Sequence, residues 1–127
     1  MKAMNFTIPL IPVTKKNSSR ILINKRTGSP FIAPSRNYEQ YEKETAYFIH
    51  PVKPIDYPCN VKCVFYMPTA RRVDLNNLLS AACDVLVKHG ALADDNSDIV
   101  VSHDGSRVVK GDINPRTEIE ITAVGGE

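Results

Sequence analysis

The segment from Leu75 to Leu86 constrains the fold most, because it has the pattern of an amphipathic helix with defined ends. Its apolar residues recur at helical spacing and form one stripe, which consists of Leu75, Leu78, Leu79, Ala82, Val85 and Leu86. Asp74 is placed to be the N-cap, since its carboxylate can accept hydrogen bonds from backbone N–H groups two or three residues on. His89 and Gly90 supply the end, because glycine suits the left-handed position after a C-cap. The sequence therefore predicts one well-defined helix with a single apolar face.

Polar and acidic side chains occupy the other side of this helix and the turn after it. Those predicted on the polar face are Asp74, Asn77, Asp84 and Lys88, with Asn76 and Ser80 at its edge. A second acidic cluster, Asp94-Asp95-Asn96, follows where the chain turns back toward the apolar run Ile99-Val100-Val101. Each piece alone is most simply a cap, a turn or a solvated face. Together, two carboxylate clusters joined by one helix and a loop can hold a hard divalent cation.

Arg71 and Arg72 lie just before the first of these carboxylates, Asp74, with only Val73 between them. Guanidinium groups bind phosphate oxygens through charge-assisted hydrogen bonds, so a phosphate held there would lie next to the metal. The combination of arginines and paired acidic clusters suggests metal-dependent cleavage of a phosphodiester.

Weaker patterns predict the remaining elements. A helix is expected from about Asn37 to His50, with Ser35 as its N-cap and with Tyr38, Tyr41, Ala46 and Ile49 as buried anchors. The predicted strands are Asn5 to Ile11, Arg20 to Ile23, Pro30 to Ala33, Asn60 to Met67, Ile99 to His103, Arg107 to Lys110 and Thr117 to Ala123. The second and third form a hairpin with Lys25 and Arg26 at its tip. The fold class is α/β (α+β): a small single domain over 1–127, with a mixed β-sheet and two main helices packed on it.

Composition narrows the classes of partner. The 127 residues are 43% apolar and contain no run near the roughly 18 apolar residues of a membrane span, and the first residues lack a signal-peptide core. We therefore expect no membrane partner. The three cysteines, Cys59, Cys63 and Cys83, complete no zinc site and suit a reducing cytoplasm. A net charge of +2 is only mildly basic, so the location of the basic residues has to support nucleic-acid binding.

Three runs of residues form a specific pattern. They are Arg71-Arg72-Val73-Asp74-Leu75-Asn76-Asn77-Leu78-Leu79, then Ala81-Ala82-Cys83-Asp84-Val85-Leu86-Val87-Lys88-His89-Gly90, then Asp94-Asp95. This pattern resembles the core of the RusA-type Holliday junction resolvases, the crossover junction endodeoxyribonucleases. That core has basic residues, Asp-Leu-Asp-Asn-Leu, an Ala-Ala-x-Asp-Ala-Leu helix and a terminal Asp-Asp. Residues 8–17 and 34–41 are similar to the family's first strand and first helix, and the resemblance covers most of the chain.

The resemblance implies an endonuclease of phages and prophages that works in the cytoplasm of a bacterial host. It implies a homodimer that cuts two strands of a four-way DNA junction symmetrically, in recombination, repair or replication. Mg²⁺ is the implied cofactor, with Mn²⁺ as the alternative. Branched DNA is the implied partner, and no small-molecule substrate is expected.

Carried over residue by residue, the family's metal-binding carboxylates fall on Asp74 and Asp95, with Asp94 adjacent. The family's second aspartate falls on Asn76, and a functional lysine in the helix falls on Ser80. Both are departures from the pattern. An asparagine oxygen can still bind a metal, so Asn76 is kept with Asp74 and Asp95 as a catalytic candidate, but it adds no charge. The negative charge that Asn76 does not supply could come from Asp84, Asp98 or Asp104, and the sequence does not decide among them.

The DNA-binding candidates are Arg71, Arg72, Lys15, Lys16, Arg107 and Asn77. His103 follows a strand near the acidic turn, and we expect it to be a solvent-exposed bystander rather than a proton carrier. Two rival functions remain. One is a catalytically weak or inactive junction-binding architectural protein, which the changes at Asn76 and Ser80 would favour. The other is a small regulator that keeps the fold without acting on DNA.

Overall fold

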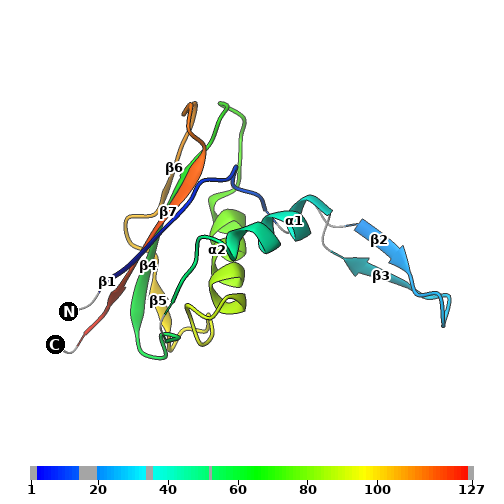
Figure 1. Ribbon diagram of the computed structural model, residues 1–127, viewed down its shortest axis with the longest axis horizontal. Coiled ribbons are helices and arrows are strands. Elements are labelled where there is room, and N and C mark those ends of the chain that lie inside the picture. The colour runs from blue at the N-terminus through cyan, green and yellow to red at the C-terminus, as the bar shows by residue number, and fades with distance from the viewer. Residues whose placement is uncertain (1–2, 15–19, 34–35, 52, 126–127) are drawn as a thin grey trace.

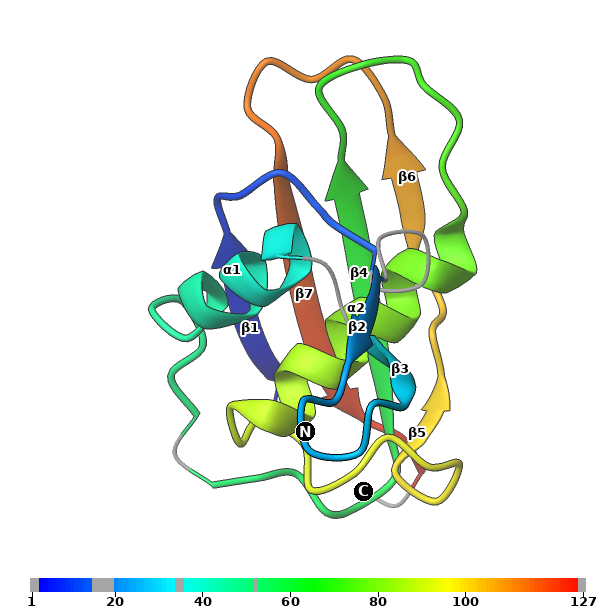
Figure 2. The ribbon, with the colours of Figure 1, turned by 90° about the vertical axis from the view of Figure 1, so that its right-hand side faces the viewer.

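One mixed sheet with both helices on a single face forms the body of the protein (Figures 1 and 2). The structure, a computed structural model, describes residues 3–14, 20–33, 36–51 and 53–125. The strands of the sheet are β1 (Ala3–Ile8), β4 (Cys59–Tyr66), β5 (Val100–Ser102), β6 (Arg107–Val109) and β7 (Arg116–Ala123). Their order is β1-β7-β4, with β5 and β6 both pairing with β4; these two pairings are parallel, whereas β7 is antiparallel to both its neighbours. The predicted mixed sheet with two helices is therefore confirmed.

The central strand β4 follows the alternation that its sequence predicts. Val61, Cys63 and Phe65 are buried, as is Met67 just beyond the strand, so one side of β4 lies in the core. Ile121 and Ile119 of β7 stand opposite Val61 and Cys63 and extend this apolar side across the sheet. The helices cover that side because burying alternating apolar side chains requires a second layer.

Some strands are displaced from their predicted ends. The first strand runs from Ala3 to Ile8 rather than from Asn5 to Ile11, since Pro9 has no N–H to donate and the chain leaves the sheet there. The strand predicted from Ile99 to His103 is limited to Val100–Ser102. Within the described parts of the chain, no helix is long and apolar enough to cross a membrane.

Helix α2 (Leu75–Lys88) has the caps that the sequence predicts. The Asp74 Oδ1 atom accepts hydrogen bonds from the backbone N–H groups of Asn76 at 2.9 Å and Asn77 at 3.3 Å. His89 is the C-cap, and Gly90 follows with φ of +83°. The buried surface is broader than the predicted stripe, because Ala81 and Cys83 are also buried. The helix is thus enclosed on more than the side that faces the sheet.

Helix α1 (Arg36–Thr45) is shorter than predicted. Tyr38 and Tyr41 are buried as expected, but the helix ends at Thr45, and Ala46 is exposed. The Thr45 hydroxyl donates to the Glu42 carbonyl at 2.7 Å, and the His89 Nε2 atom lies 2.8 Å from the same oxygen. This tertiary contact occupies a carbonyl that a longer helix would use. The predicted cap Ser35 lies outside the described residues.

We expect His89→Ala to lower the free energy of unfolding by about 1–2 kcal/mol, because it removes one of the two donors to the Glu42 carbonyl at the half-buried end of α1. Lys88→Ala is the matched control. Lys88 forms an exposed ion pair with the side chain of the same residue, Glu42, at 3.1 Å, and such pairs contribute less than about 1 kcal/mol. Urea denaturation of both variants tests the contrast. Equal losses would mean that the His89 contact has no special role.

The strands β2 (Arg20–Ile23) and β3 (Pro30–Ala33) form the predicted hairpin, with the predicted bounds. Its turn is closed locally: Asn24 Oδ1 accepts from the backbone N–H of Arg26 at 2.8 Å, and Gly28 adopts φ of +75°. The hairpin stands clear of the body on the side of α1 away from the sheet (Figure 1).

Candidate active site

A hollow of about 270 Å³ lies along one edge of α2. Its lining comes from three parts of the chain: Asn76, Leu79, Ser80 and Cys83 of α2, Asp95 of the following loop, and Val100 and His103 of β5 and its end. The loop is held in place by backbone pairing, since the N–H of Ile55 donates to Ala91 and the N–H of Ala93 donates to Ile55, both at 2.9 Å. The structure therefore brings the edge of the helix and the second acidic cluster together.

Asp74 does not line this hollow, but it precedes Asn76, which does, by two residues. Its Oδ1 atom is held by the two backbone N–H groups at the start of α2, which fixes the orientation of the carboxylate. Its Oδ2 atom makes no hydrogen bond to any residue that the structure describes. One exposed, oriented oxygen thus remains for a ligand next to Asn76, which lines the hollow.

The two neighbouring aspartates of the second cluster differ in their contacts. Asp94 accepts from the backbone N–H of Asp95 at 2.7 Å through Oδ1 and from the Asn96 side chain at 3.1 Å through Oδ2. Asp95 is exposed, lines the hollow and forms no side-chain hydrogen bond or ion pair within the described parts of the chain. Asp95 is therefore the better placed of the two for binding a cation, and Asp94 holds the turn.

Two further side chains define the chemistry of the hollow. Burial, followed by the charges of Asp95 and Asp84, raises the pKa of the Cys83 thiol to about 12, so the thiol stays protonated at neutral pH. His103 is half-buried, and its Nδ1–H donates to the Val61 carbonyl at 2.8 Å, which leaves the Nε2 lone pair free in the neutral ring. The prediction that His103 is solvent-exposed was wrong. No local pattern signals this, because the partner is on β4.

None of the three residues considered as sources of missing charge lines the hollow. Asp84 is half-buried near α1. The pKa of Tyr38 in that helix is raised mainly by burial and next by the charge of Asp84. Asp98 and Asp104 are both exposed, and their backbone N–H groups donate to asparagine side chains. Among the residues with described positions, no group of three or more His, Cys, Asp or Glu side chains could hold a metal ion. Any cation here must use amide, hydroxyl or water oxygens as well.

The basic candidates are distributed unevenly around the site. Arg71 and Arg72 are exposed and line a second hollow of about 340 Å³, which includes Ile11, Pro12 and Val73 and lies on the chain segment leading into Asp74. Arg107 is exposed on β6 at the sheet edge. Asn77 is half-buried in the first turn of α2. Lys15 and Lys16 lie outside the described residues.

Arg116, by contrast, is engaged in contacts within the fold. Its guanidinium lies 3.7 Å from the centroid of the Tyr66 ring, and it pairs with Glu118 at 2.8 Å and Asp112 at 3.3 Å. Arg71 and Arg72 have no ion pair within the described residues, so both remain available to phosphate.

Comparison with known proteins adds a finding that is independent of this geometry. The family model described as the endodeoxyribonuclease RusA matches residues 9–122 of the 127. The comparison with curated proteins found no match. The matched range includes the hollow, both acidic clusters and the arginine pair, and the family acts on branched DNA. The chain belongs to the RusA family of endodeoxyribonucleases.

Proposed function

We propose that this protein is a Mg²⁺-dependent endonuclease that resolves four-way DNA junctions by paired strand cuts. The observation that supports this best is the position of Asp95 in the hollow beside α2, with Asp74 and its oriented free oxygen at the start of the same helix. Arg71 and Arg72 precede them, where they can hold phosphates that flank the cut. Membership of a nuclease family directed at branched DNA agrees with this chemistry.

The donors at this site suit magnesium. Mg²⁺ binds hard oxygen ligands, keeps several waters and needs only one or two carboxylates. Asp74 and Asp95 would supply the carboxylates and Asn76 an amide oxygen, while the protonated Cys83 would not compete as a soft ligand. Mn²⁺ takes the same donors. When bound, the metal supplies a water of lowered pKa and neutralises charge on the phosphate. The protein's own part is to orient the carboxylates and to position the phosphates through Arg71 and Arg72.

Two further proposals complete this function. A homodimer is the simplest way to cut a two-fold junction symmetrically, since a C₂ arrangement places two identical sites in related positions. The family relationship favours a phage or prophage origin and a working place in the cytoplasm of a bacterial host. Light scattering of the protein alone tests the first proposal, and the genomic neighbourhood of the gene tests the second.

The alternative function is a catalytically weak or inactive junction-binding protein. Two observations favour it: Asn76 and Ser80 stand where the family resemblance places an aspartate and a lysine, and no cluster of three acidic or histidine ligands occurs in the described structure. A single experiment separates these functions. Purified protein is incubated with a synthetic four-way junction in Mg²⁺ or in EDTA, with a linear duplex of the same sequence as the control substrate. Metal-dependent cleavage of the junction supports the nuclease, whereas binding without cleavage supports the alternative.

We expect the double variant Arg71→Ala/Arg72→Ala to bind junctions more weakly and with a flatter salt dependence. Each lost phosphate contact lowers the slope of log K against log salt by about 0.9 for duplex DNA. If both arginines contact phosphate, the slope falls by nearly two units. Lys53→Ala is a control, because Lys53 is also exposed but lies in the linker before β4. Fluorescence anisotropy over a salt series measures both, and an unchanged slope for the arginine variant would place the pair away from DNA.

A further inference from the structure

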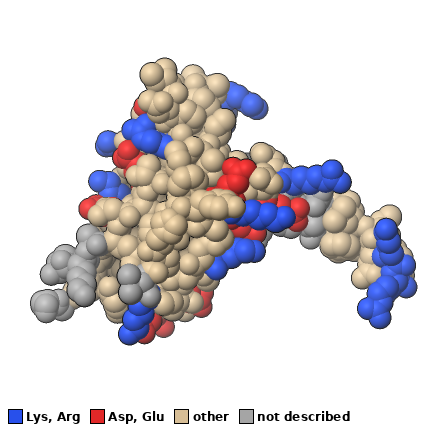
Figure 3. Space-filling model, viewed as in Figure 1, with Lys and Arg blue, Asp and Glu red and all other residues tan. Residues whose placement is uncertain are grey.

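The hairpin of β2, its turn and β3, residues 20–33, is here called the arm, and its apolar side chains are uncovered. Ile21 is 74% exposed, Ile23 is 66% exposed and Phe31 is 47% exposed. The arm extends away from the body, and its outer end carries the basic side chains of Lys25 and Arg26 (Figures 1 and 3). An isolated two-stranded hairpin is only marginally stable in water. The strands of the arm therefore carry large apolar side chains of the kind that proteins usually bury, but these side chains are exposed.

Both faces of the arm contribute to this apolar surface. Side chains alternate along a strand, so Ile21 and Ile23 share one face of β2, and Leu22 lies on the other face. Leu22 stands directly opposite Phe31 of β3, and both of them are exposed. Packing against the protein's own body could cover one face at most. The exposure of both faces favours an external partner that encloses the arm.

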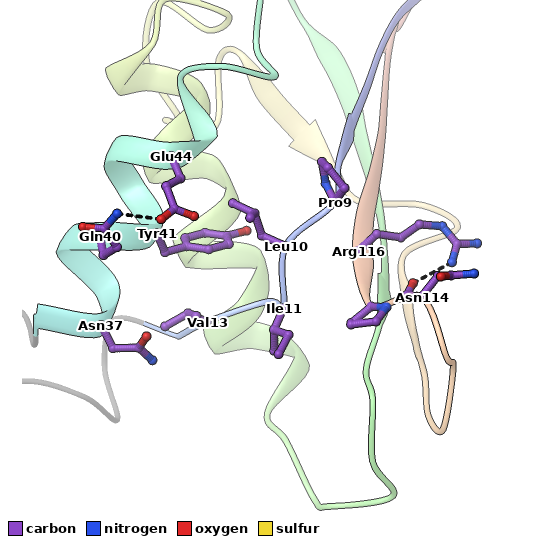
Figure 4. Close-up of a pocket in the computed structure, with 11 residues that line it drawn as sticks. Pro9, Leu10, Ile11, Val13, Asn37, Gln40, Tyr41, Glu44, Asn114 and Arg116 are labelled. Carbon is purple, nitrogen blue, oxygen red and sulfur yellow. Dashed lines mark hydrogen bonds between the residues drawn. The ribbon is translucent and has the colours of Figure 1, made fainter.

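The body carries a groove of matching character, with a volume of about 640 Å³ (Figure 4). Leu10, Ile11 and Val13, from the segment after β1, form one side of it. Tyr41 and Glu44 of α1 form the other side, and the loop before β7 closes one end. Ile11 is an exposed apolar side chain although it lies in this groove. The groove is thus an apolar surface without an occupant from the described chain.

We propose that the arm of one copy lies in this groove of a second copy, and that the exchange is reciprocal. This inference rests on the homodimer proposed above and names the surface that builds it. A two-fold axis makes each copy both donor and acceptor, so both exposed apolar features are buried together. Charge is also complementary, because the arm carries Lys25 and Arg26 and the groove carries Glu44. The groove is also lined by Arg116, but this guanidinium is paired with Glu118 and Asp112. Within one molecule the arm points away from the body, which leaves the groove to the partner (Figure 1).

A complementation experiment tests this arrangement without DNA or metal, so its result is independent of nuclease activity. The arm variant is Ile21→Glu and the groove variant is Ile11→Glu. Tyr47→Glu is the matched control, since Tyr47 is also 74% exposed but lines neither surface. We expect wild type and control to sediment as dimers. Each variant should dissociate with a Kd at least about 100-fold higher, because a charge placed in an apolar contact acts twice in a symmetric dimer.

The mixture of the two variants gives the diagnostic result. An arm variant keeps an intact groove and a groove variant keeps an intact arm, so an equimolar mixture should form heterodimers through one intact contact. A groove variant that dimerises like wild type would overturn the proposal in favour of packing between arms. Monomeric wild type, or a mixture without heterodimers, would also overturn it. So would an arm variant that remains a dimer but loses junction binding, since the arm would then contact DNA.

A second measurement keeps the test decisive if a charged variant does not fold. The double variant Ile21→Cys/Ile11→Cys is treated with a short bismaleimide and analysed on a denaturing gel. The native thiols Cys59, Cys63 and Cys83 are buried and do not interfere. Covalent dimers from the double variant, with few from either single variant, are the expected outcome. Cross-links confined to single chains would show that the arm folds back on its own groove.

Discussion

Asp95→Asn is expected to abolish Mg²⁺-dependent cleavage of a four-way junction while leaving junction binding nearly intact. Asp95 is the carboxylate in the hollow, and its side chain has no hydrogen bond or ion pair within the described residues. Losing the charge of a direct ligand should reduce activity by at least about 100-fold, since even changes around metal ligands cost about 10–100-fold. Phosphate contacts from Arg71 and Arg72 are not altered. Single-turnover cleavage and gel-shift affinity, measured on the same preparations, test the two halves of this expectation.

Asp94→Asn is the matched control for that experiment. It changes the charge one residue away, but both Asp94 oxygens accept hydrogen bonds within the turn, so its effect on cleavage should be smaller. Asp74→Asn should resemble Asp95→Asn in activity without unfolding α2, because asparagine caps helices about as well as aspartate. If Asp94→Asn proved more damaging than Asp95→Asn, the ligand would be Asp94. Parallel loss of binding in folded Asp95→Asn would contradict a role in metal binding alone.

Asn76→Asp is expected to lower the Mg²⁺ concentration required for cleavage by about tenfold. Asn76 lines the hollow with Asp95 and follows Asp74 by two residues. Two opposite unit charges about 4 Å apart in water attract each other by about 1 kcal/mol. A dication at that distance from the new carboxylate would therefore bind more favourably by up to about 2 kcal/mol, which is roughly 30-fold in affinity. Repulsion from the neighbouring carboxylates in the metal-free protein opposes part of this gain. The side chains are nearly the same size, so packing should change little.

Mg²⁺ titrations of the cleavage rate measure this effect, together with melting temperatures in Mg²⁺ and in EDTA. The new carboxylate should lower the melting temperature in EDTA and raise the stabilisation that Mg²⁺ gives. Asn24→Asp is the control, since it adds the same charge at an exposed asparagine that does not line the hollow. A higher Mg²⁺ requirement in Asn76→Asp would place Asn76 away from the metal.

The sequence by itself determined the elements that depend on local physics. Helix α2 was predicted with both caps, because an N-cap carboxylate and a C′ glycine act within a few residues. The central strand and the hairpin followed from alternation and turn residues. The resemblance carried by the Asp74-to-Asp95 block also named the family that the comparison found.

Only the tertiary structure decided the features that join distant segments. The end of α1 at Thr45 depends on His89, which lies 44 residues away. The half-buried position of His103 depends on a carbonyl of β4, and the hollow admits Asp95 while Asp94 turns its oxygens back on the loop. Sequence spacing cannot distinguish such neighbours, because the direction of a side chain after a turn is set by whichever segment packs against it.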